Sequence, residues 1–402
     1  MFEAIEAAPK DAILGLTEAF RADPRAEKIN LSVGVYQDES GKTPLLECVK
    51  EAERRLASAP TTKSYLPISG LAEYCSAVGE LAFGAASEAL SRKRVAVAQT
   101  PGGTGALRVA ADFIHANLPR ATVWLSEPTW PNHPQIFAAA GVPTKTYAYF
   151  DKSKNALDLA GMVGVIGKMA AGDVVLLHGC CHNPTGIDPT TAQWSAIADA
   201  VQKQGVLPLV DFAYQGFGLG LEEDAAGLRA FCRPGAELLA CSSFSKNFSL
   251  YRERVGALFG LTADSTAAAA VQSQFEKVVR ANYSNPPGHG AEIVATILRD
   301  PALRTQWEGE LATMRNRIND MRKALVAALK KHGVPGDYSF IERQLGMFSF
   351  SGLTKEQVAA LQAEHAIYAV GSGRINVAGL STANVDRVAE CIGAVVAQAV
   401  KA

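Results

Sequence analysis

The sequence predicts an α/β protein, with a large domain built on a mostly parallel sheet covered by helices and a smaller α+β domain. Between residue 94 and about residue 262, short β-rich runs alternate with helical patterns, which is typical of a parallel sheet with helices on both faces. After Pro301 a single long amphipathic pattern follows, and the chain then returns to short mixed elements. A chain of 402 residues is long enough for two such domains.

Seven segments of the large domain have the composition of strands. They are residues 94–100, 121–130, 144–150, 173–181, 206–215, 237–245 and 254–262. Residues 106–118, which follow the turn "PGGTG", have helical spacing, and so do residues 191–204, which end at Gly205.

The C-terminal part begins with a long helix. Apolar residues recur at spacings of three and four from Leu303 to Leu329, and the helix should end near Gly333. We expect a strand in "MFSFSGLT", a helix near 355–365, extended chain in "IYAVGSGRINVAG" and a last helix from about 382. The expected division is therefore 1–44 (an N-terminal arm and part of the small domain), 45–305 (large) and 306–402 (small).

Composition argues against several classes of partner. The 39 basic and 40 acidic residues are mixed and give a net charge of −1, so there is no one-signed field for nucleic acid or an anionic membrane. Seven cysteines, an odd number without a CxxC pair, suggest reduced thiols. The N-terminus lacks a signal-peptide pattern, and no apolar stretch approaches the ~20 residues of a membrane-spanning helix. We expect a soluble, cytoplasmic protein.

The segment "GGTG" (102–105) follows a predicted strand and opens a helix, where backbone N–H groups favour a phosphate. It is not a dinucleotide fingerprint, because Arg108 stands where glycine or alanine would be needed, and no GK[ST] of a P-loop follows. Ser243 and Arg254 could add phosphate contacts. An ordinary tight turn is the alternative interpretation.

Asp211 ends the apolar run "VLPLVD", where a carboxylate needs a partner. That partner could be a protonated ring nitrogen of a cofactor, or a neighbouring loop that the carboxylate anchors. Tyr214 could reach the same ligand with its hydroxyl, or simply pack half-buried.

Further polar and aromatic residues lie in the loops after the strands. Asn183 in "HNPTG" could contact a ligand or form a turn, and Trp130 in "PTWPNH" could stack on a ring or belong to the core. His133 and His178 could support such a site or be ordinary packing histidines. Cys180, Cys181 and His182 are adjacent rather than at metal-ligand spacing, so we expect no metal site.

Lys246 in "SSFSKNFSLYRERVG" follows a predicted strand at the same edge of the sheet. A partly desolvated lysine near another cation has a lowered pKa and can act as an amine nucleophile, although an ordinary solvated lysine is the simpler alternative. A lysine, a ring-nitrogen partner, a ring-oxygen partner and a phosphate cradle together indicate a pyridoxal 5'-phosphate (PLP) site.

Five longer segments carry a family resemblance over essentially the whole chain. They are "QTPGGTGALRVAADF", "HGCCHNPTG", "DFAYQGFG", "SFSKNFSLYRERVG" and "RANYSNPPGHGA". The chain resembles the class I PLP-dependent aminotransferases of fold type I, in the aspartate branch shared with bacterial aromatic aminotransferases. The resemblance implies a fold-type I PLP transferase and a homodimer with shared active sites.

The resemblance assigns the cofactor contacts position by position. Lys246 corresponds to the lysine that bonds covalently to PLP, Asp211 to the partner of the pyridine nitrogen, and Trp130 to the residue stacked on the ring. Tyr214 and Asn183 correspond to the partners of the ring oxygen. The phosphate contacts correspond to Gly103, Thr104, Ser243, Arg254 and, from the other subunit, Tyr65.

The resemblance also assigns the substrate contacts. Arg374 corresponds to the arginine that holds the α-carboxylate, Gly34 lies in the segment that closes over the substrate, and Arg280 corresponds to the arginine that binds a distal carboxylate across the dimer interface. Trp130 and Asn183 also belong to this set. "RANYSNPP" favours this interpretation of Arg280 over that of a surface arginine.

The implied reaction is ping-pong transamination between L-aspartate and 2-oxoglutarate, with Lys246 moving the Cα proton. Two departures from the aspartate-specific pattern, and one segment that resembles the aromatic branch, widen the expected substrates. Gln37 stands in place of a lysine, Ser64 in place of an asparagine, and "FSLY" in place of "FGLY". Tyrosine and phenylalanine could therefore be accepted too. The alternatives are a mainly aromatic aminotransferase, another PLP reaction such as β-decarboxylation, or a non-catalytic binding relative.

Overall fold

The computed structural model describes residues 1–8, 14–59 and 62–401. The chain divides into two compact units, each described by itself below. The large unit comprises Pro44–Asn183 and Ile187–Arg315, and the small unit comprises Met1–Thr43, Pro184–Gly186 and Asn316–Ala402. Within the described residues, no helix combines the length and apolar character needed to span a membrane. The domain boundaries expected near residues 44 and 305 stay a prediction.

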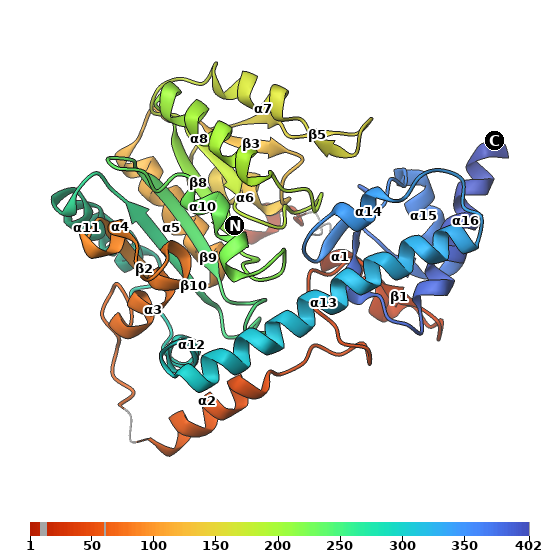
Figure 1. Ribbon diagram of the computed structural model, residues 1–402, viewed down its shortest axis with the longest axis horizontal. Helices are drawn as coiled ribbons and strands as arrows, with labels where there is room; N and C mark the ends of the chain where they lie inside the picture. Colours follow the sequence, from red (N-terminus) through yellow and green to blue (C-terminus); the bar gives the residue numbers. More distant parts are fainter. Residues whose placement is uncertain (9–13, 60–61, 402) are drawn as a thin grey trace. The chain divides into compact units, whose positions relative to one another are not determined.

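A seven-stranded sheet forms the centre of the large unit, in the order β2-β10-β9-β8-β7-β3-β4 (Figure 1). Its strands are parallel except for β10, which is antiparallel to both of its neighbours. They are β2 (Val95–Pro101), β3 (Val123–Glu127), β4 (Thr144–Ala148), β7 (Val174–His178), β8 (Leu207–Phe212), β9 (Leu238–Ser243) and β10 (Val255–Leu261). All seven overlap the segments predicted as strands, which confirms the α/β fold class. A separate antiparallel pair consists of β5 (Phe150–Asp151) and β6 (Ala156–Leu157).

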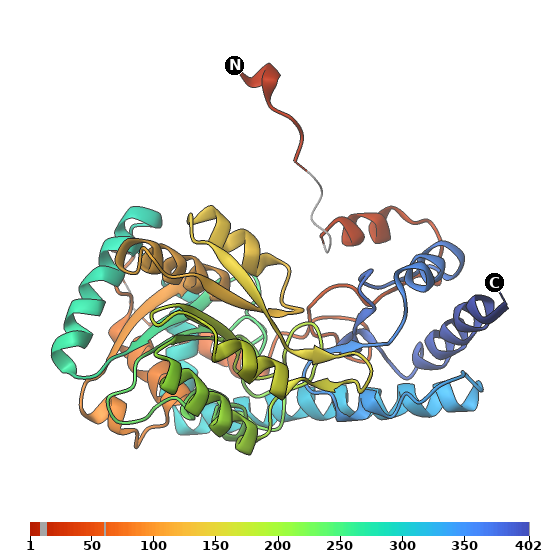
Figure 2. The ribbon, with the colours of Figure 1, turned by 90° about the horizontal axis from the view of Figure 1, so that it is seen from above.

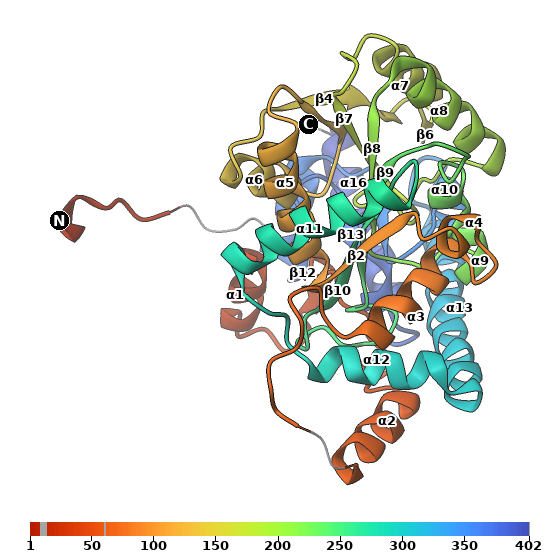
Figure 3. The same cartoon turned by 90° about the vertical axis from the view of Figure 1, so that its left-hand side faces the viewer.

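Helices cover the sheet, and the contact between α5 and the sheet forms much of the core. The helices of the large unit are α2 (Glu47–Ser58), α3 (Ala72–Phe83), α4 (Glu88–Ser91), α5 (Gly102–Asn117), α6 (Asn132–Ala139), α7 (Leu159–Ile166), α8 (Thr191–Gln204), α9 (Leu221–Asp224), α10 (Ala226–Arg229), α11 (Ser265–Asn282) and α12 (His289–Arg299). α5 packs on β9 and β10 and α11 packs on β2, as Figure 3 illustrates. Leu107, Ala110 and Ile114 of α5 are fully buried against Leu209 and Leu258 of the sheet.

Two helix ends follow the local rules that predict them. α8 starts with a capping box between Thr190 and Gln193, and it ends at Gly205, whose φ of 68° is readily adopted only by glycine. α5 differs from the prediction, because it starts at Gly102 rather than near Ala106. The segment "GGTG" is thus the first turn of the helix and not a turn that precedes it.

The small unit combines short strands with helices. α13 (Pro301–Lys331) begins in the large unit and continues into the small unit at Asn316. The other elements are η1 (Phe2–Ala4), α1 (Leu14–Ala22), β1 (Ile29–Asn30), α14 (Phe340–Arg343), β11 (Phe348–Phe350), α15 (Lys355–His365), β12 (Ile367–Tyr368), β13 (Arg374–Asn376), η2 (Val377–Gly379) and α16 (Val385–Lys401). β1 pairs with β12 in parallel and β11 pairs with β13 antiparallel. α15 packs against α16 (Figure 2).

Candidate active site

The carboxyl ends of β8 and β9 bring Asp211 and Lys246 together. These strands are adjacent and parallel, so the loops that follow them leave the sheet at the same edge. Lys246 Nζ lies 4.5 Å from the centre of the Tyr214 ring. Burial lowers the pKa of Lys246 to about 8, with Arg254 acting in the same direction and Asp211 opposing it. Lys246 is therefore an amine of the kind that can accept a proton near neutral pH.

The Lys246 turn is held in place by aromatic packing. The N–H of Ser249 closes the turn on the Lys246 carbonyl at 3.0 Å. Trp307 of α13 donates its indole N–H to the Asn247 carbonyl at 2.7 Å and stacks on Phe248, with ring centres 4.4 Å apart. Asn247 Nδ2 also donates to the Gln215 carbonyl at 3.2 Å. Gln215 is the neighbour of Tyr214 in the sequence. The turn that carries the lysine is thus bonded to the loop after β8.

Asp211 is a buried carboxylate with a histidine partner. His133 Nε2 lies 3.0 Å from Asp211 Oδ2, and the two side chains are 0% and 11% exposed. Burial would raise the pKa of Asp211, but the hydrogen bond from His133 and the charge of nearby groups, including Lys246, hold that pKa below its ordinary value. Asp211 is therefore ionised at neutral pH.

A hydrogen-bond relay behind Asp211 fixes the tautomers of two histidines. The Asn183 N–H donates to His178 Nδ1 at 3.4 Å, so His178 carries its proton on Nε2 and donates to Thr129 Oγ1 at 3.2 Å. The Thr129 hydroxyl then donates to His133 Nδ1 at 2.7 Å, which leaves the His133 Nε2 proton for Asp211. Burial and nearby His133 lower the pKa of His178 to about 3, which keeps His178 neutral. The relay thus leaves His133 Nε2 as the hydrogen-bond donor to Asp211.

Trp130 lies next to this relay. Its ring meets the His133 ring edge-on, with the centres 5.2 Å apart, and it packs half-buried against the main core of the large unit. His133 is itself buried and also bonds Asp211.

The first turn of α5 packs tightly against the ends of β9 and β10. A Cβ on Gly102, whose φ is 75°, would lie 2.3 Å from Arg254 Nη2, and one on Gly103 would lie 2.9 Å from Ser243 Cβ. Thr104 belongs to the same turn. Arg254 is exposed and donates to Ser245 Oγ at 3.2 Å. The free N–H groups of a first helical turn, a hydroxyl and a guanidinium form a donor set that suits a phosphate.

In the small unit, Arg374 and Gly34 lie on the same aromatic ring. The guanidinium carbon of Arg374 lies 4.2 Å from the centre of the Phe348 ring, and a Cβ on Gly34 would lie 2.8 Å from Phe348 Cζ. Arg374 is 2% exposed, and it donates to the Ser32 carbonyl at 2.5 Å. Sequence reasoning did not identify Phe348, although it lies in a predicted strand.

Tyr65 and Arg280 are not part of either cluster. Tyr65 is 93% exposed, and Arg280 is exposed and donates to the Ser284 hydroxyl. Gln37 is half-buried and its carbonyl accepts from Arg317, whereas Ser64 is exposed beside Thr62. Ser249 has a φ of 56° and donates to the Pro44 carbonyl at 2.6 Å.

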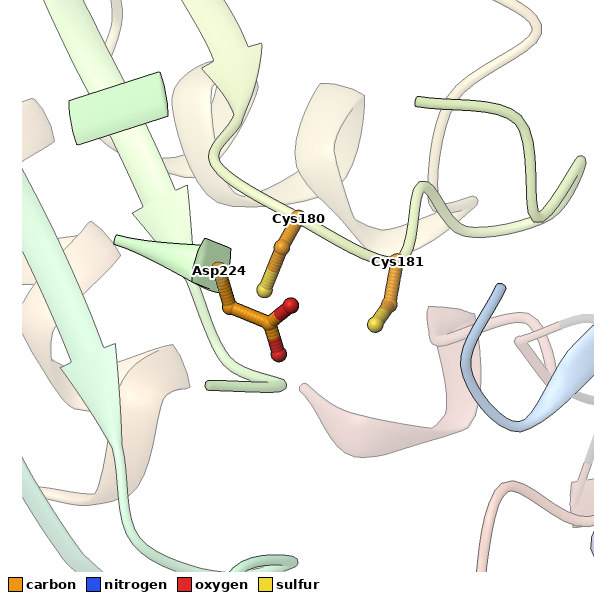
Figure 4. A group of neighbouring side chains, drawn as sticks. All are labelled: Cys180, Cys181 and Asp224. Carbon is orange, nitrogen blue, oxygen red and sulfur yellow. The ribbon is translucent and has the colours of Figure 1, made fainter. Parts of the chain in front are cut away.

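One further group of potential ligands lies beside this edge of the sheet. Cys180, Cys181 and Asp224 are buried, and Figure 4 shows both thiols pointing toward the carboxylate. The carboxylate oxygens of Asp224 accept the N–H groups of Gly216, Gly218 and Leu219 at 2.8–2.9 Å. Burial raises the pKa of the Cys180 thiol well above its ordinary value, which opposes metal binding. Asp224 thus serves as an anchor for the loop 216–219.

Known proteins resemble this chain over almost its whole length. Residues 26–392 match the family model described as aminotransferase class I and II. The chain is 55% identical over 395 residues to an aspartate aminotransferase of Salmonella typhi, covering 98% of this chain and 100% of that protein. It is 49% identical over 396 residues to an aromatic-amino-acid aminotransferase of Pseudomonas aeruginosa, covering 98% and 99%.

A solved structure gives the same result. The aromatic-amino-acid aminotransferase of Burkholderia pseudomallei, crystallised covalently bound to pyridoxal phosphate, matches with a TM-score of 0.96 at 48% identity, covering 98% of this chain and 99% of that one. The chain belongs to the class I and II aminotransferases.

Proposed function

We propose that this chain is a PLP-dependent aminotransferase that exchanges the amino group between L-aspartate and 2-oxoglutarate, giving oxaloacetate and L-glutamate by a ping-pong mechanism. The observation that carries the proposal is the pair of Lys246, with its pKa lowered to about 8, and the ionised Asp211 at adjacent strand ends. The aspartate aminotransferase with 55% identity supports it.

The residues of the large unit fit PLP. Bound PLP supplies an aldehyde that bonds to amines and a ring that withdraws electrons from the substrate Cα. An ionised carboxylate at Asp211 suits a protonated ring nitrogen, and the donor set of the first turn of α5 suits the phosphate. The proposed contacts are Lys246, Asp211, Tyr214, Asn183, Trp130, Gly103, Thr104, Ser243, Arg254 and the Tyr65 of a second subunit.

In the proposed mechanism the side chains orient the substrate and move one proton. Lys246 Nζ would accept the proton from the substrate Cα and would then deliver it to the cofactor carbon that carries the transferred nitrogen, which its pKa near neutrality favours. Asp211 keeps a proton on the ring nitrogen. Tyr214 and Asn183 bond the ring oxygen, and Trp130 covers one face and excludes water.

Substrate carboxylates are proposed to bind two arginines. Arg374 binds the α-carboxylate as a planar fork, next to the Gly34 segment, and Arg280 of a second subunit binds the distal carboxylate. Asn183 and Trp130 complete the substrate contacts. The exposure of Arg280 and of Tyr65 supports a homodimer with shared sites, because neither side chain is buried in its own subunit.

The substrate range is proposed to include tyrosine and phenylalanine. Both aspartate and aromatic aminotransferases are close relatives, and Gln37 and Ser64 remove charge or polar bulk relative to the aspartate-specific pattern. A mainly aromatic activity, or β-decarboxylation on the same cofactor, is the second candidate. We further propose that the enzyme is cytoplasmic. Residues 1–44 are proposed to form an arm and part of the small domain, residues 45–305 the PLP-binding domain, and residues 306–402 the small domain.

The visible absorption spectrum of the PLP-loaded protein tests the function. We expect a yellow band that is bleached by L-aspartate and, separately, by L-phenylalanine, and that returns with 2-oxoglutarate. Bleaching by L-phenylalanine alone would make the aromatic activity the main one. Release of CO₂ and alanine from L-aspartate would instead indicate β-decarboxylation. A protein that takes up no PLP would contradict the proposal.

A further inference from the structure

Arg322 is a buried cation whose guanidinium holds one strand and the loop before it. It lies in the part of α13 that belongs to the small unit and is 1% exposed. Nη2 donates to the carbonyls of Gly346 at 2.6 Å and Phe348 at 2.7 Å. Nη1 donates to the Ile341 carbonyl at 3.3 Å and to the Ser349 hydroxyl. A single side chain thus fixes the backbone from residue 341 to residue 349.

Stability alone gives little reason for an arginine at this position. Burial of a guanidinium carries a desolvation penalty, and apolar side chains of similar volume are often at least as stabilising. An arginine differs from them in its planar fork of donors, which dictates where several acceptors lie. The fork of Arg322 therefore fixes the position of the carbonyls that it binds, among them that of Phe348.

The side chain of Phe348 connects this backbone to the carboxylate-binding residue. β11 is antiparallel to β13, with Phe350 opposite Arg374. The Phe348 ring lies 4.2 Å from the Arg374 guanidinium carbon and leaves no room for a side chain on Gly34. A shift of the β11 backbone would therefore move the ring on which Arg374 lies.

We propose that Arg322 is a positioning residue for the substrate carboxylate, acting through the β11 backbone and the Phe348 ring on the orientation of Arg374. The proposal rests on the proposed role of Arg374. Arg322, Phe348 and Arg374 all lie in the small unit. Lys246, Asp211 and the phosphate donors lie in the large unit. Loss of Arg322 should thus weaken carboxylate binding and leave cofactor binding unchanged.

The test compares Arg322→Met with the wild-type PLP-loaded enzyme. We expect KM for L-aspartate to rise about 10-fold, because a misplaced binding group commonly loses that much. The dissociation constant of succinate, an unreactive dicarboxylate, should rise by a similar factor. The kcat at saturation should fall less than about 3-fold, and the affinity for PLP and the visible spectrum should not change.

Arg94→Met is the matched control. Arg94 is also buried, at 3% exposed, and bonds the carbonyls of Thr262 and Ala236 and the Glu88 carboxylate in the large unit. The Arg94→Met variant should lose thermal stability and keep the KM of the wild type for L-aspartate. Arg322→Lys, which keeps the charge but not the fork, should give an intermediate KM and carries the test if Arg322→Met does not fold.

Two results would overturn the inference. One is an Arg322 variant whose KM and succinate affinity match those of Arg94→Met. The other is a variant that loses PLP affinity in parallel with succinate affinity, which would indicate general loosening. Wild-type protein that takes up PLP but does not react with L-aspartate would instead contradict the proposed function, so the two failures are distinguishable.

Discussion

His133 Nε2 lies 3.0 Å from Asp211 Oδ2, and the Thr129 hydroxyl on the other ring nitrogen dictates that His133 donates this hydrogen bond. This hydrogen bond helps to keep the carboxylate ionised in a buried place. Asp211 can thus hold a cofactor ring nitrogen in its protonated form.

His133→Phe should raise the pKa of Asp211, because the carboxylate loses its charge-stabilising donor. Since Asp211 must be ionised, activity should then disappear at a higher pH as the solution is acidified. A kcat/KM profile that extends from neutral pH down to about pH 4, near the ordinary pKa of an aspartate, checks this shift of the acidic limb. His133→Gln keeps an amide N–H donor and should shift the limb less; equal profiles for both variants would contradict the role of the donor.

Lys246→Met should abolish turnover and, in the cofactor-free chain, increase stability at neutral pH. The folded pKa of about 8 lies below the ordinary 10.5, so the protonated lysine destabilises the folded state fully below pH 8. This penalty shrinks between pH 8 and 10.5. The shift corresponds to about 3 kcal/mol, and because Lys246 keeps some exposure we expect a gain of roughly 1–3 kcal/mol.

Urea unfolding at pH 7 and pH 10, at one chain concentration, measures that gain. The advantage of Lys246→Met should be largest at pH 7 and small at pH 10. Lys203→Met, at an exposed position of α8, should change the free energy of unfolding by less than about 0.5 kcal/mol at either pH. If the free energy of unfolding of Lys246→Met changed as little as that of this control, the buried protonated amine would not destabilise the folded state.

Gly103→Ala should weaken PLP binding at least about 10-fold, because its Cβ would lie 2.9 Å from Ser243 Cβ and push the first turn of α5 away from β9. Titration of the cofactor-free protein with PLP measures this affinity. Gly309→Ala is the control, since a Cβ on this residue of α13 meets nothing within 4 Å, and it should stabilise the helix by about 0.5–1 kcal/mol without affecting PLP. Equal PLP affinities in both variants would argue against a phosphate at Gly103.

Trp307→Phe should lower the free energy of unfolding by about 1–3 kcal/mol, because the buried Asn247 carbonyl loses its donor while the stacking on Phe248 is kept. Trp307→Ala should cost more, about 3–5 kcal/mol, because it also leaves a cavity. Urea unfolding gives the ranking, and kcat should fall in the same order if the turn positions Lys246. Unchanged kcat in a destabilised Trp307→Phe would separate the stability of the turn from catalysis.

The strands and their loops could be predicted from the sequence because each is a local pattern. Apolar runs locate the strands, and the carboxyl ends of the parallel strands then fall at one edge of the sheet, which is how Asp211 and Lys246 are brought together. The start of α5 was misplaced because glycine favours turns, whereas here Gly102 and Gly103 are needed for close packing within a helix.

The supporting residues could not be predicted in the same way. The relay to Asp211 joins Thr129 in the loop after β3, His133 in α6 and His178 at the end of β7, and single-sequence spacing contains no signal for such bonds. Arg322 sits in a helix whose apolar residues define its pattern, so it looks like one of its charged surface positions until its burial is known. In both cases the role of the side chain depends on hydrogen bonds to residues that are distant in the sequence.

The pairing of β1 with β12 has a consequence for how the chain is made. Ile29 needs Ile367 as its partner, so the first strand leaves the ribosome long before the strand it binds. At roughly 5–20 residues per second, the wait is on the order of 15–70 s. The large unit can fold from consecutive segments during this interval, while β1 stays without its partner strand until synthesis is nearly complete. Leu31, which is buried in the folded chain, stays exposed until then and is the kind of apolar residue that a chaperone would bind.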